Sequence, residues 1–146
     1  MFKHILLATD GSAACDQAAR IAVALAREHG ARLTAIYVVD PYPYLGIGQA
    51  NPLGFQAYMQ AAHVHAGRAL ARAAELCDDG GTPIPMETRI VEEATAAHGI
   101  AQTARDEHAD LIVVGSHGHG ALRKLMLGSV TTRVLAEATV PVLVVR

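Results

Sequence analysis

The chain alternates between short apolar runs and longer segments with helical periodicity. Four of the short runs are apolar and largely unbroken, which is typical of buried strands. A fifth run alternates apolar with polar residues, which is typical of a strand at the edge of a sheet. We therefore expect strands over residues 2–9, 32–39, 110–114 and 142–145, and an edge strand over residues 86–91.

Between these runs, apolar residues recur at spacings of three and four, which places them on one face of a helix. Ser12 is suited to cap the first such helix and Gly30 to end it. A stripe of small residues in the second helix indicates close packing on a sheet rather than a ligand box. The expected helices cover residues 13–29, 55–77, 94–108 and 130–138.

One segment, Asp40–Gly54, has no periodicity and holds three prolines and three glycines in fifteen residues. We interpret it as a loop over one edge of the sheet. It is either a plain connector or a lid or partner surface. The reason for the second reading is that the loop would otherwise leave four apolar side chains in water: Tyr42, Tyr44, Leu45 and Ile47.

Regular alternation of strands and helices predicts the fold class. The expected fold is a three-layer α/β/α domain over residues 1–146, with a five-stranded parallel sheet and right-handed crossovers. The expected strand order is 3-2-1-4-5, with strands numbered along the chain. The chain then changes direction between the first and fourth strands, and open α/β sheets bind ligands in the crevice at that point.

Composition narrows the function classes. Apolar residues make up 51% of the chain and Trp is absent, so the core must be aliphatic. A net charge of −2 argues against general nucleic-acid or membrane-surface binding. Cys15 and Cys77 make no disulfide framework and are expected to be small buried thiols, with a redox role as the alternative. No apolar run approaches the roughly 18 residues that span a bilayer, and no leader pattern opens the chain, so a cytoplasmic location is expected.

The strongest chemical signal is the glycine-rich stretch from Gly115 to Ser129, which joins a buried strand to the last helix. Gly115 and Gly118 let a ligand approach the backbone closely. We expect Gly128 to present bare amides and Ser129 to sit at the helix cap. Unpaired N–H groups at a helix start suit phosphate. Asp10 ends the first strand, so it should lie near Gly115 and can accept hydrogen bonds from ribose hydroxyls or an amino group; capping the next helix is its alternative role.

The spacing Gly-x-x-Gly, nine residues, then Gly-Ser resembles the ATP-binding signature of universal stress proteins. The similarity extends from Ile5–Ser12 to Val140–Val145. It implies an adenine nucleotide alpha hydrolase-like fold and a stress-response module without fast catalysis. The implied ligand is ATP, or ADP or AMP, with Mg²⁺ held through the phosphates. The family also commonly dimerises through its last strand, which implies a homodimer through Val142–Val145.

The resemblance carries three groups of contacts onto this chain. Residues matching the adenosine site are Ala8, Thr9 and Asp10, with Val38 against the base. Residues matching the ribose–phosphate wall are Val114, Gly115, His117 and Gly118. Residues matching the phosphate cradle are Gly128, Ser129 and Val130.

Histidines supply the main alternative. His117 and His119 flank Gly118, and they could assist a slow ATPase or phosphoryl-transfer reaction with Mg²⁺ on the phosphates. A metal site on them is disfavoured because no Cys, Asp or third His joins them nearby. A scaffold that binds no nucleotide is a third possibility, which the intact signature opposes. The remaining histidines outside the second helix are expected at the surface or at helix ends: His4, His29, His98 and His108.

Overall fold

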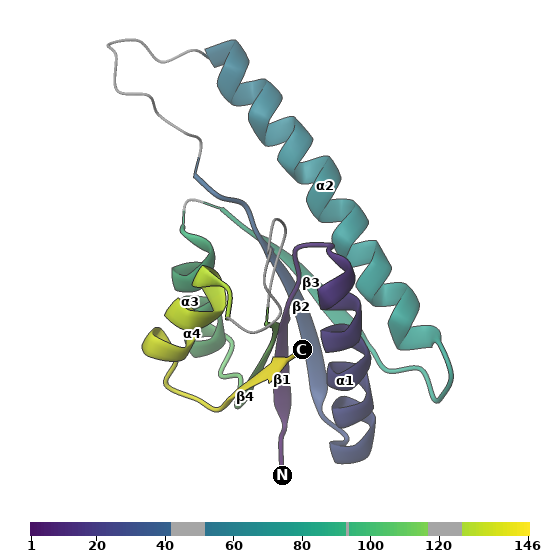
Figure 1. Ribbon diagram of the computed structural model, residues 1–146. Coiled ribbons are helices and arrows are strands. Elements are labelled where there is room, and N and C mark those ends of the chain that lie inside the picture. The colour runs from purple at the N-terminus through teal and green to yellow at the C-terminus, as the bar shows by residue number, and fades with distance from the viewer. Residues whose placement is uncertain (42–51, 93, 117–126) are drawn as a thin grey trace.

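Five strands and four helices alternate along the part of the chain that the structure describes (Figure 1). The computed structural model describes residues 1–41, 52–92, 94–116 and 127–146. The elements in chain order are β1 (His4–Ala8), α1 (Ala13–His29), β2 (Arg32–Val38), α2 (Pro52–Asp78), β3 (Met86–Val91), α3 (Ala96–Asp106), β4 (Leu111–Gly115), α4 (Ser129–Glu137) and β5 (Val142–Val145).

The strands form one parallel sheet in the order β3-β2-β1-β4-β5, which confirms the predicted fold class and strand order. Helices α1 and α2 cover one face, and α3 and α4 cover the other (Figure 1). The chain leaves β1 toward α1 on one face of the sheet and leaves β4 toward α4 on the other face. Because β1 and β4 are neighbouring parallel strands, their carboxyl ends lie side by side, with Leu7 opposite Val113.

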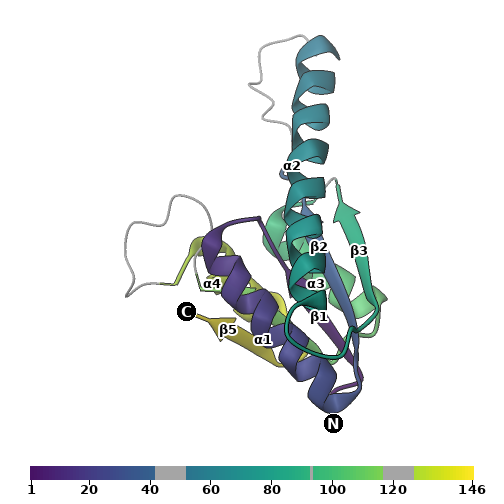
Figure 2. The same ribbon diagram turned by 90° about the vertical axis from the view of Figure 1, so that its right-hand side faces the viewer.

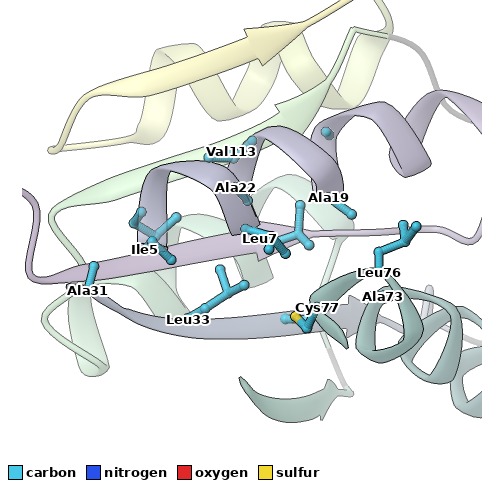
Figure 3. Packing of buried hydrophobic residues seen from close by; sticks show 14 of the residues in the cluster. Ile5, Leu7, Ala19, Ala22, Ala31, Leu33, Ala73, Leu76, Cys77 and Val113 are labelled. Carbon is cyan, nitrogen blue, oxygen red and sulfur yellow. The ribbon is translucent and has the colours of Figure 1, made fainter. Parts of the chain in front are cut away.

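Alternate residues of the central strands belong to two aliphatic cores, one on each face of the sheet. Ile5 and Leu7 of β1 pack under α1 and α2, as Figure 3 shows, whereas Leu6 packs under α3 and α4. This alternation follows from the two-residue period of a strand. The helices contribute many alanines to both cores, so their backbones lie close to the sheet.

Helix α2 is longer than the sheet that it covers. Its buried residues lie between Ala66 and Cys77, and its N-terminal half projects past the ends of the strands (Figure 2). The helix begins at Pro52, three residues before the predicted start, because proline is tolerated in the first turn where its missing N–H has no acceptor. Asp40 and Pro41 have no regular structure, as predicted, and residues 42–51 of the predicted loop lie outside the described residues.

The prediction for His4 is wrong. We expected a surface residue at the start of a strand, but His4 is 3% exposed. Its Nδ1–H group donates to the Glu107 carbonyl at 3.0 Å, and Nε2 lies 2.8 Å from Thr34 Oγ1. The cause is the position of β1 in the middle of the sheet, where both faces are covered from the first residue of the strand.

Candidate functional site

A cavity of about 470 Å³ opens at the carboxyl ends of β1, β2 and β4. This volume is in the range of pockets that hold small ligands. The structure brings nine predicted site residues together in its lining: Ala8, Thr9, Asp10, Val38, Val114, Gly115, Gly128, Ser129 and Val130. The other two, His117 and Gly118, lie outside the described residues, as does His119.

The turn after β1 fixes a carboxylate at the rim. Asp10 Oδ1 accepts hydrogen bonds from the Ser12 N–H group at 2.8 Å and from Cys15 Sγ at 3.0 Å. Gly11 makes the turn possible because its φ of 81° is rarely adopted by other residues. Ser12 occupies the cap position of α1 as predicted, but its side chain makes no capping hydrogen bond. Asp10 therefore holds the start of α1, which is one of the two roles weighed from the sequence, and it also lines the cavity.

The start of α4 forms the opposite side of the cavity. The helix cap is Gly128, not Ser129 as predicted, and the Gly128 N–H group is not bare, because it donates to the Ser116 carbonyl at 2.8 Å. The first-turn N–H groups, from Ser129 onward, have no acceptor within the helix, and the glycine cap has no side chain to accept from them. The expected anion-binding donors thus lie one residue further along the chain than the glycine spacing suggested.

Buried Thr131 ties α4 to the end of β4. Its hydroxyl donates to the Gly115 carbonyl at 2.8 Å, and the side chain is 4% exposed. This bond holds the first turn of α4 against the carboxyl end of β4. Sequence reasoning missed Thr131, although its place in the first turn of the last helix was a usable signal.

Apolar walls and acidic groups line the rest of the cavity. Ile36, Ile100 and Val114 lie behind the space between the two rims as buried branched aliphatic side chains. Tyr37 and Asp40, which sequence reasoning also missed, come from the end of β2. Burial and the charges of Asp10 and Asp40 raise the pKa of the Tyr37 hydroxyl, so it remains protonated well above neutral pH.

Helix α2 contacts the rim of the cavity from outside. His65 Nε2 lies 3.1 Å from the Asp10 carbonyl, and its ring meets Tyr37 edge-on with centroids 5.5 Å apart. The Tyr58 hydroxyl donates to the Asp40 carbonyl at 2.7 Å. The projecting half of α2 is therefore anchored to the residues that follow β1 and β2. No periodic pattern in the sequence indicated these two anchors.

The chemistry of the lining residues suits binding. One end offers carboxylate acceptors, the middle offers aliphatic surface and the far end offers helix N–H donors. Cys15 is the one thiol in the lining, and burial raises its pKa, which disfavours the nucleophilic thiolate. Within the described residues, no group of three or more His, Cys, Asp or Glu side chains could hold a metal ion.

Comparison with known proteins gives one family. A family model described as "Universal stress protein family" matches residues 1–146. A universal stress protein of Thermus aquaticus is 42% identical to this chain, and the match covers 100% of both. The structure of universal stress protein UspA from Lactobacillus plantarum superposes with a TM-score of 0.82 at 30% identity, covering 99% of this chain and 97% of that one.

A second similar structure is that of a universal stress protein in complex with cAMP. It has a TM-score of 0.63 and 25% identity, and the match covers 99% of this chain and 97% of that one. Full-length matches to a family model and to a relative at 42% identity agree with the glycine signature and with the sheet order. The chain therefore belongs to the universal stress protein family.

Proposed function

We propose that this chain binds an adenine nucleotide, with ATP as the principal ligand, and that it acts as a stress-response module without fast catalysis. The observation that carries the proposal is the cavity, whose lining includes nine of the predicted site residues, drawn from four separate segments of the chain. The complex of a structural neighbour with cAMP supports an adenine nucleotide as the ligand class.

The ligand would extend across the cavity from the carboxylates at one end to the helix N–H groups at the other. The partly exposed aliphatic side chain of Val38 suits the adenine ring, and the Asp10 carboxylate suits ribose hydroxyls. The first turn of α4 suits the phosphates. The family resemblance also assigns His117 and Gly118 to the ribose–phosphate wall, and both lie outside the described residues. Mg²⁺ would be held through the phosphates.

The test is a titration with ATP, ADP and AMP, with GTP as the base control, by calorimetry and thermal shift. An ATP concentration a thousandfold above Kd stabilises the folded state by about 4 kcal/mol. Gly128→Val should abolish this gain, because it places a branched side chain at the cap. The Gly128 φ of −63° and ψ of 158° suit any residue, so the fold should persist. Gly67→Val is the matched control, because its added side chain begins in open space.

Two outcomes would overturn the proposal. One is a parent protein whose melting temperature no adenine nucleotide raises. The other is a Gly128→Val variant that binds ATP as tightly as the parent. Phosphate release measured in the same samples separates binding from the slow ATPase alternative, in which His119→Ala abolishes turnover.

We also propose a homodimer through β5. This strand pairs with β4 on one side, and within the described part of the chain nothing pairs with its other side. The carbonyls of Pro141 and Val145 accept from β4, so the N–H groups of Val142 and Val144 point to the outer edge. Val144→Pro removes one outward donor without breaking the β4 ladder, and light scattering at tens of micromolar should then report monomers. A parent that is monomeric in this assay would refute the dimer.

We also propose a cytoplasmic location. None of the described helices is both long and apolar enough to cross a membrane.

A further inference from the structure

We propose that Cys15 is a positioning residue for the nucleotide: its thiol holds the Asp10 carboxylate in the orientation that receives the ribose. This inference rests on the proposed adenine-nucleotide function. The two residues are joined in both directions. Cys15 Sγ donates to Asp10 Oδ1 at 3.0 Å, and the Asp10 N–H group approaches the same sulfur at 3.5 Å.

The contact bridges two elements at the rim of the cavity. Asp10 lies in the turn after β1, whereas Cys15 lies in the first turn of α1. Both residues line the cavity, yet Cys15 is only 6% exposed. The sulfur is therefore held between the helix and the turn, where it can direct a side chain that faces the ligand.

The protonation state of the thiol supports this role. Burial raises the pKa of Cys15, and the neighbouring Asp10 charge acts in the same direction, although the Asp10 N–H group opposes it. The sulfur therefore keeps its proton at neutral pH and acts as a donor to the carboxylate. A thiolate would instead repel Asp10, so the geometry requires the protonated form.

Two donors on one oxygen restrict the Asp10 side chain. The Ser12 N–H group donates to Oδ1 at 2.8 Å from the backbone, and Cys15 adds the second hydrogen bond from a different direction. Fixing the carboxylate before the ligand arrives removes part of the ordering cost of binding.

If Cys15 were only a small buried residue that fills space, the expected affinities of its variants would differ. Alanine would then replace Cys15 without loss, and serine, which is more polar, would be worse. A positioning donor predicts the reverse order, because a serine hydroxyl can donate to Asp10 and alanine cannot. Cys77 provides a matched control, since it is also a buried thiol but lies in the core between α2 and the sheet.

The experiment measures ATP affinity by calorimetry for the parent, Cys15→Ala, Cys15→Ser and Cys77→Ala. We expect Kd to rise about three- to tenfold in Cys15→Ala and to stay within about twofold of the parent in the other two, because a hydrogen bond to a charged group contributes measurably. In an Asp10→Asn background, Cys15→Ala should have little further effect. Equal affinity of Cys15→Ala and the parent, loss in Cys15→Ser as large as in Cys15→Ala, or additive effects would each overturn the proposal.

A spectroscopic reading from the parent does not depend on the stability of any alanine variant. The S–H stretching band of Cys15, assigned by its loss in Cys15→Ser, should lie at lower frequency than that of Cys77, whose thiol contacts Met86 Sδ at 3.5 Å. It should also move when ATP binds. A Cys15 band at the Cys77 frequency that ATP leaves unchanged would overturn the proposal. A flat ATP titration of the parent would overturn the proposed function as well, which distinguishes the two failures.

Discussion

Gly99 tests how closely α3 must pack on the sheet beneath the cavity. A Cβ atom at this position would lie 3.0 and 3.1 Å from the two Val38 methyl groups and 3.3 Å from Val91 Cγ1. Val38 lines the cavity, and Gly99 is buried in the helix that covers it. Helix propensity by itself favours alanine over glycine at this position, whereas the packing in the structure predicts a loss of stability on replacement.

The magnitude follows from two opposing terms. Alanine is favoured over glycine in a helix interior by about 1 kcal/mol. Overpacking a core costs about 1–3 kcal/mol. Both Val38 methyl groups are close, so rotation of this stiff β-branched side chain relieves one contact but not the other. We expect Gly99→Ala to lower the free energy of unfolding by about 1 kcal/mol net, which is roughly 3 °C in melting temperature.

Gly67→Ala is the matched control, because a Cβ atom there meets nothing within 4 Å. It lies inside α2 and should gain about 0.5–1 kcal/mol from helix propensity alone. Both variants are compared with the parent by urea unfolding without nucleotide. If Gly99→Ala gains stability as Gly67→Ala does, α3 moves away from β2 at no cost and the packing argument is wrong.

Three further predictions concern the turn, the helix start and the ionisable groups of the site. Gly11→Ala should lower the melting temperature more than Gly30→Ala, because both have positive φ but only the Gly11 Cβ would meet Ala69 Cβ, at 3.1 Å; equal losses would count against that contact. Thr131→Val should cost about 1–2 kcal/mol in urea unfolding by orphaning the Gly115 carbonyl, while Thr131→Ser keeps the bond; equal stability of the two variants would contradict this. Burial raises the pKa of Cys15 and Tyr37 in the folded state, so the unfolded chain loses these protons first and the free energy of unfolding should fall as pH rises above about 9. Cys15→Ser should reduce that fall, and an unchanged alkaline slope would refute the assignment to Cys15.

Much of the fold could be read from local patterns. The apolar run at β1 and the helical spacing of α1 each reflect which face of one element meets the core, and that information lies within a few neighbouring residues. Regular alternation of strands and helices then restricted the connections to right-handed crossovers. The glycine spacing located one side of the cavity, and the end of β1 located another. The rule that ligands bind at the carboxyl ends of the strands joined them.

Tertiary structure decided which groups meet across elements. The burial of His4, the close approach of Gly99 to Val38 and the bond from Cys15 to Asp10 depend on the separation of two elements, which no periodicity records. The same holds for His65, whose contact with the Asp10 carbonyl joins positions 55 residues apart. Sequence patterns state which face of an element is apolar, so they determined the layers and the sheet. Distances and hydrogen-bond partners depend on how closely those layers pack against one another, so only the tertiary structure could show them.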